Sequence, residues 1–313
     1  MLLSFYGIIP LVWLVLIIDI FYLNGKIKSI LPLNPDDQRL FLLFFLWPHI
    51  IMSLVTMLDK EYIRGYRNSI YSYKFLGFLT IFFVYFINKD LFFFIYAILT
   101  LKHFTCQQIG METLISGRQP KSSYIYYFVI LLILNCWVEF PRLPLLGDLR
   151  YFLITYKLDF YFFGVVSLFL FYNTSGQYLK NKKNPVILGN SFLLITIYLT
   201  YLLGYTFFSF LIPRIIHDLS AMVFYLFHDY NRNKSEKRNS IFKIIPYTEK
   251  YFIIWPFLFS ILFANFLFEL AIRVEIMAIF LFSLGLLHYF VEDFIWKKDG
   301  LHRREIFINV DFR

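Results

Sequence analysis

Long apolar runs separated by short polar loops occupy almost the whole length of this 313-residue chain. Hydrophobic residues make up 59% of the sequence and charged residues only 16%, whereas a soluble domain carries about a quarter charged residues. Such a chain is typical of an integral membrane protein, in which helices satisfy the backbone hydrogen bonds internally. We therefore expect an all-α, polytopic helical bundle, with residues 1–313 forming a single transmembrane domain and no soluble domain.

A membrane-spanning helix needs about 20 mostly apolar residues, and cutting the chain at its charge, Pro and Gly clusters gives about ten such segments. They begin near residues 2, 39, 74, 91, 123, 157, 187, 214, 251 and 274. The segments at 74–88 and 214–230 are short, so nine helices is the alternative. The opening segment has no basic region before it and no small-residue cleavage site, which indicates a retained helix instead of a removed signal peptide.

The lysines and arginines indicate the orientation, because cytoplasmic loops retain an excess of both. With ten helices and the N-terminus inside, 20 of them fall in inner loops and nine in outer loops. This distribution predicts that both termini are cytoplasmic, and we expect a bacterial inner membrane. The net charge of +9 is spread over these loops and forms no single basic stripe, so nucleic acid is not an expected partner. Membrane lipids are the expected partners instead.

Five of the six histidines lie inside apolar segments, where an ionisable side chain is costly and therefore a candidate functional residue. Each alone can be explained by packing between helices. Three of them, however, lie near the middle of different segments and could meet at one ion, as in other metal-binding helical bundles. The sixth, His302, lies in a basic tail and is expected to be solvated. The candidate metal ligands are His49, His103, His217, His228 and His288.

Polar residues near these histidines are candidates for orienting ligands or transferring protons. His217 and His228 share a helix face but lie about 16 Å apart along it, as do the aspartates that follow them, so both histidines cannot bind one ion on an unbroken helix. Pro213 predicts the start of this helix, which leaves end-capping as a second explanation for its first aspartate. Gln107 and Glu292 each follow a histidine by four residues and share its face. The candidate catalytic residues are Asp218, Asp229 and Gln107.

A site rich in imidazole suits iron, zinc or copper better than magnesium or calcium, which prefer oxygen ligands. Scarce sulfur disfavours copper(I), which leaves Fe(II), with open positions for O2, or zinc as the expected cofactor, and copper as a further alternative. The sequence contains no GxSxG, GxxxxGK[ST], HExxH or clustered-histidine box.

Three short segments resemble, in order, the histidine segments of the membrane-embedded, retinal-forming β-carotene dioxygenases of the Brp/Blh type. They are WPHIIMS around His49, KHFTCQQIG around His103 and AMVFYLFHDYNRN around His228, and the resemblance around them extends over about fifty of the 313 residues. That family binds a non-haem iron through histidines and cleaves a carotenoid with O2. The resemblance implies that these three histidines are iron ligands and that Tyr225 lies near the substrate channel.

The resemblance leaves the fourth ligand open. Arg232 stands where the family has a second histidine in its third segment, so His217 or His288 would complete the set. Our leading hypothesis is a histidine-ligated iron oxygenase that acts with O2 on a lipophilic, carotenoid-like substrate from the bilayer. One alternative is a transporter or lipid-handling protein with a His/Asp relay along one helix face. The other is a structural or assembly protein with buried, hydrogen-bonded histidines.

Overall fold

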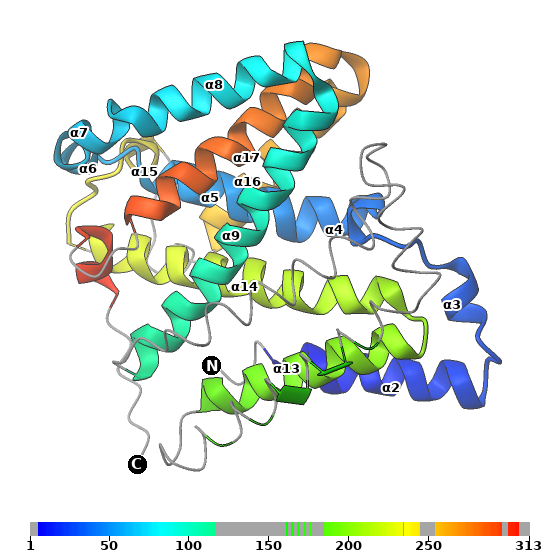
Figure 1. Cartoon of the computed structure of the whole chain (residues 1–313). Helices are drawn as coiled ribbons and strands as arrows, with labels where there is room; N and C mark the ends of the chain where they lie inside the picture. Colours follow the sequence, from blue (N-terminus) through cyan, green and yellow to red (C-terminus); the bar gives the residue numbers. More distant parts are fainter. Residues whose placement is uncertain are drawn as a thin grey trace. The chain divides into compact units, whose positions relative to one another are not determined.

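The computed structural model describes residues 6–116, 185–233, 235–244, 254–295 and 300–306, together with scattered residues between 161 and 176. All the regular structure in these ranges is helical, as Figure 1 shows, and an isolated β-bridge joins Asp59 to Asn239. The predicted all-α class is thus confirmed for the described part of the chain. Eight of the ten expected segments correspond to helices there, whereas those starting near 123 and 157 lie outside it, apart from the scattered residues.

The chain divides into two compact units, and two of the boundaries between them fall inside helices, after Leu99 and after His217. Unit 1 comprises Met1–Gln38, Thr100–His217 and Val310–Arg313. Unit 2 comprises Arg39–Leu99 and Asp218–Asn309.

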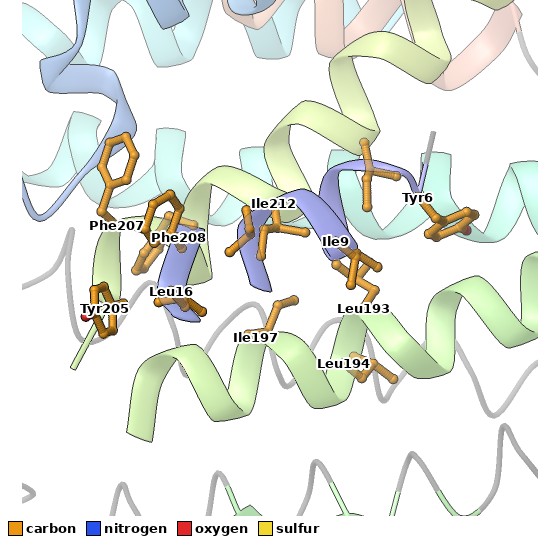
Figure 2. Close-up of a cluster of buried hydrophobic side chains, with 13 residues drawn as sticks. Tyr6, Ile9, Leu16, Leu193, Leu194, Ile197, Tyr205, Phe207, Phe208 and Ile212 are labelled. Carbon is orange, nitrogen blue, oxygen red and sulfur yellow. The ribbon is translucent and has the colours of Figure 1, made fainter. Parts of the chain in front are cut away.

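Unit 1 is built on a core between α2 (Ile8–Phe21), α13 (Pro185–Leu202) and the first part of α14 (Thr206–Asn233). Figure 2 shows Leu16, Leu193 and Ile212 among the side chains of this core. A buried polar contact lies beside it, in which the Tyr6 hydroxyl donates to Asn190 Oδ1 at 2.6 Å. Gln108, on α9 (Lys89–Ser116), donates to the same oxygen at 2.6 Å. This network links α9 and α13 to the turn that precedes α2.

The turn after α2 explains the carboxylate inside the first apolar segment. The chain reverses at Gly25, whose φ of +77° suits a residue without Cβ, and enters the short helix α3 (Lys26–Ile30). Asp19 accepts hydrogen bonds from the backbone N–H groups of Ile27 at 2.8 Å and Lys28 at 3.0 Å. It therefore satisfies N–H groups at the start of α3 that have no partner within the helix.

Unit 2 surrounds α5 (Trp47–Thr56), whose apolar residues pack against α16 (Ile254–Arg273) and α17 (Glu275–Ile295). The π-helical turn η2 (Leu42–Leu46) directly precedes α5. Pro48 has no N–H to bond to the preceding turn, and the wider turn accommodates this. The other elements of unit 2, besides parts of α9 and α14, are α4 (Arg39–Phe41), α6 (Lys60–Gly65), α7 (Arg67–Ile70), α8 (Tyr73–Ile87), α15 (Ser240–Ile244) and η5 (His302–Glu305).

The start predicted for α14 is wrong. The helix begins at Thr206, so Pro213 lies inside it and Asp218 is far from its N-terminus. The reason is burial: Phe207, Phe208 and neighbouring apolar residues pack into the core of unit 1, which extends the helix upstream of the proline. End-capping therefore does not explain Asp218.

Two helical stretches in the described part of the chain are long and apolar enough to cross a membrane. They are Arg39–Thr56 and Thr206–Asn233. Ile8–Phe21 and Leu188–Leu202 are apolar but shorter.

Candidate metal centre

Two helices of unit 2 bring together two histidines and a carboxylate. His49 lies on α5, and His288 and Glu292 lie one turn apart on α17, as their spacing predicts. All three are buried, with exposed fractions of 1%, 1% and 5%. Each offers a donor atom, and these atoms lie within 4.8 Å of one another. We call these residues the histidine–carboxylate cluster.

His49 has a carboxylate on each side of its ring. Its Nδ1 lies 2.9 Å from Oδ1 of Asp218, a fully buried residue of α14. Its Nε2 lies 3.5 Å from Oε1 of Glu292, which is longer than an ordinary hydrogen bond. The His49 and His288 rings meet edge to face, with centroids 4.4 Å apart.

His288 and Glu292 have polar partners of their own. Ser53, one turn after His49 on α5, has its Oγ 2.6 Å from His288 Nδ1 and donates to the Ile50 carbonyl at 2.6 Å. The hydroxyl has a single proton, so its oxygen accepts from the imidazole. Tyr225, a fully buried residue of α14, donates a hydrogen bond to Glu292 Oε1. The predicted site residue Tyr225 thus contacts the cluster.

This donor set fits a transition metal. Two imidazoles and one carboxylate are the protein ligands of non-haem Fe(II) oxygenases, which keep further coordination positions open. The same set also binds catalytic zinc. Magnesium and calcium suit it less well, because they prefer oxygen ligands. Metal-binding histidines usually donate their second ring N–H to a carboxylate or another acceptor, which is the relationship between His49 and Asp218.

His103 and His217, also predicted as ligands, lie in unit 1. Both are buried, and their rings meet edge to face with centroids 5.0 Å apart. Phe104 stacks on His217 at 3.8 Å. Gln107 donates to the backbone carbonyl of His217 at 2.8 Å, so this hydrogen bond reaches the main chain and not an imidazole.

His228 belongs to a second polar cluster of unit 2. Burial raises the pKa of the Tyr62 hydroxyl, which therefore stays protonated and donates to His228 Nε2 at 2.8 Å. His228 Nδ1 lies 2.9 Å from Asp229 Oδ1, which also accepts from Thr56 at 2.8 Å. Both ring nitrogens are thus hydrogen-bonded within the protein. We do not assign His228 as a ligand, and we call this group the Tyr62–His228 cluster.

The two clusters follow each other along the same helices. Ser53 and Thr56 are three residues apart on α5, and Tyr225 and His228 are three residues apart on α14. The first member of each pair contacts the histidine–carboxylate cluster, and the second belongs to the Tyr62–His228 cluster.

Arg232 joins the end of α14 to three carboxylates. Its guanidinium is paired with Asp59 at 3.0 Å, with Glu305 at 3.1 Å and with Glu61. It also lies over the Tyr62 ring, 4.7 Å from the centroid. At the position where the resembled family has a histidine, this chain therefore has a structural ion-pair centre.

The expectation that His302 is solvated is wrong. The residue is fully buried, and its ring lies 3.9 Å from the Tyr62 ring and 4.6 Å from the His228 ring. Burial lowers its pKa well below the ordinary value, and the nearby His228 and Arg232 lower it further. The arginines next to it in the sequence suggested a solvated position, whereas Glu305 of the same segment pairs with Arg232 and the His302 ring stacks on that of His228.

Sequence reasoning missed Ser53 and Tyr62. A signal existed for Ser53, which follows His49 by four residues and so shares its helix face. No pattern links Tyr62 to His228, which lies 166 residues further along the chain.

The fold and the site define an all-helical protein, in its described part, with a buried two-histidine, one-carboxylate cluster able to hold a metal ion. No protein-family model, curated protein or solved structure matches this chain.

Proposed function

We propose that this protein is a membrane-embedded, iron-dependent oxygenase whose centre is held by His49, His288 and Glu292. The observation that carries the proposal is the approach of His49 Nε2 to Glu292 Oε1 at 3.5 Å in a buried site. With His49 Nδ1–H donating to Asp218, both facing atoms are acceptors, and acceptors repel unless a cation lies between them. Bonds of about 2.1 Å to one ion place two ligand atoms about 3.0–3.4 Å apart, close to this separation.

A proton shared between the two atoms is the other way to satisfy them. It would make His49 an imidazolium between two carboxylates and would suit the alternative of a proton-coupled transporter. A metal ion would also explain why a second imidazole, that of His288, lies beside His49, with the ring centroids 4.4 Å apart.

The proposed setting is a bundle of about ten membrane helices with both termini cytoplasmic, in a bacterial inner membrane. The two helical stretches long enough to span carry His49 and Asp218, which supports a centre within the bilayer. A substrate would then enter laterally from the lipid. The resemblance to carotenoid-cleaving dioxygenases gives the substrate class, a lipophilic polyene.

Three protein ligands leave coordination positions open, and the bound iron would supply O2 activation there. A dioxygenase transfers both oxygen atoms of O2 to its products, so cleavage of one C=C bond gives two carbonyl groups without an external reductant. The protein's own residues bind and orient: Asp218 holds His49, Ser53 holds His288 and Tyr225 holds Glu292.

Metal analysis of detergent-purified protein tests this proposal. Wild type should contain about one iron per chain, and His49→Ala and His288→Ala should lose it. His228→Gln is the matched control, because His228 is an equally buried histidine outside the cluster, and it should keep the metal. Absence of metal from protein made in metal-replete cells would overturn the proposal and favour the transporter. Zinc in place of iron would retain the centre but exclude the O2 chemistry.

A further inference from the structure

We propose that Asp218 is a positioning residue that fixes His49 as its Nδ1–H tautomer, so that Nε2 is the atom that binds the metal. This inference rests on the proposed function and assigns a role to a residue that does not itself bind the ion. It also distinguishes two buried aspartates of α14, Asp218 and Asp229, whose contacts with histidine look alike.

The contact between Asp218 and His49 determines the tautomer. An ionised carboxylate accepts hydrogen bonds and cannot donate them, so at 2.9 Å from Asp218 Oδ1 the His49 Nδ1 must carry the proton. A neutral imidazole has one N–H, and its lone pair is then on Nε2. That nitrogen points to the side where Glu292 lies, at 3.5 Å.

The comparison with His228 shows why the second nitrogen matters. His228 Nδ1 likewise contacts an aspartate, Asp229, at 2.9 Å. Its Nε2, however, already accepts a hydrogen bond from the Tyr62 hydroxyl, whose oxygen lies 2.8 Å away. At His49 the corresponding neighbour is a carboxylate, which has no proton to give. The same aspartate–histidine contact therefore turns the Nε2 lone pair toward a carboxylate at His49 and toward a hydroxyl donor at His228.

Burial strengthens the effect of Asp218. Its side chain is fully buried and His49 is 1% exposed, so little solvent competes for the hydrogen bond. A carboxylate partner also makes the imidazole a stronger base, and removing such a partner typically lowers metal affinity 10–100-fold. We therefore expect Asp218 to influence metal affinity although it lies on the opposite side of the imidazole from the ion.

The test is a Co(II) titration of the full-length, metal-stripped protein in detergent, followed by the visible spectrum of the ion. Asp218→Asn keeps the side-chain shape but removes the charge, and its Co(II) affinity should fall about 10–100-fold with an altered spectrum. Asp229→Asn is the matched control, because it makes the same change on the same helix outside the histidine–carboxylate cluster. Its Co(II) affinity should stay within about twofold of wild type even where its melting temperature falls.

Asp218→Glu retains the carboxylate and should recover part of the lost affinity. It also tests the inference should the Asn variant fail to fold. Equal Co(II) affinity in wild type and Asp218→Asn, with His49→Ala impaired, would overturn the role of Asp218 and leave the metal centre standing. Asp218→Glu binding no better than Asp218→Asn would also overturn the role. Failure of wild type to bind Co(II) would overturn both the inference and the proposed function.

Discussion

The Tyr225 hydroxyl donates a hydrogen bond to Glu292, which lies 67 residues further along the chain and on another helix. Tyr225→Phe removes this donor but keeps the aromatic packing. We expect the carboxylate to lose its fixed orientation, with about a tenfold loss of Co(II) affinity and little change in helix content. Tyr230→Phe, which changes a tyrosine of the same helix outside both clusters, is the control. Unchanged affinity in Tyr225→Phe would contradict the expectation.

The ion pairs of Arg232 should be important for stability. Arg232→Gln leaves Asp59, whose side chain is only 4% exposed, without its cationic partner, and such a loss costs about 3 kcal/mol or more. Arg232→Lys should recover little, since a single ammonium group cannot span three carboxylates. Thermal unfolding in detergent measures the stability of both variants against wild type. Arg238→Gln is the control, because its contact with Glu61 at 3.4 Å is exposed and should contribute less than about 1 kcal/mol.

Acid should destabilise the packing of the C-terminal segment through His302. The pKa of this histidine is lowered in the folded protein, mainly by burial, so below about pH 6.5 the unfolded chain binds a proton that the folded one does not. Stability therefore falls as the pH falls from 8 to 5.5.

His302→Phe isolates this effect from other titrating groups, because a phenyl ring can keep the stacking on Tyr62 but does not titrate. The melting temperature of the variant should depend less on pH than that of wild type. An equal dependence of melting temperature on pH in the variant and in wild type would show that His302 does not cause the acid sensitivity.

Gly189 should tolerate no side chain. A Cβ built there would lie 2.6 Å from the Tyr6 ring, which is held by its hydrogen bond to Asn190. Gly189→Ala should therefore cost about 1–3 kcal/mol and loosen the core shown in Figure 2. At Gly110, also helical, a Cβ would meet nothing within 4 Å, so Gly110→Ala should be neutral or stabilising. Thermal unfolding of the pair provides the comparison.

The proposed orientation can be checked by cysteine labelling in a background in which Cys106 and Cys136 are serine. A membrane-impermeant maleimide should label Ser29→Cys in intact cells, because the loop at residues 24–38 is expected outside. Ser235→Cys, in the polar stretch after α14, should react only after permeabilisation. The reverse pattern would contradict the orientation derived from lysine and arginine.

Much of the histidine–carboxylate cluster could be predicted from local patterns. His49 and His288 stand out as ionisable residues in apolar segments, and the spacing of Glu292 places it on the face of His288. Periodicity describes one helix at a time, however. It could not show that Asp218 lies against His49, 169 residues away, or that His228 has its own partner in Tyr62.

The errors have physical causes as well. The basic residues around His302 suggested a solvated tail, whereas the ion pair between Glu305 and Arg232 holds that segment against α14. Pro213 suggested a helix start, whereas the burial of aromatic residues before it extends the helix. In both cases tertiary contacts outweighed the local signal.

The succession of the two clusters along α5 and α14 limits how this protein can move. Sliding one helix past the other by a turn would separate Thr56 from Asp229 and Asp218 from His49 at the same time. Each of these contacts is buried, so breaking one without a replacement is costly, and a shear motion would break both. α5 and the part of α14 from Asp218 onward should therefore move as one rigid body. Any opening that admits a substrate to the cluster would have to come from α17 or from helices outside this pair.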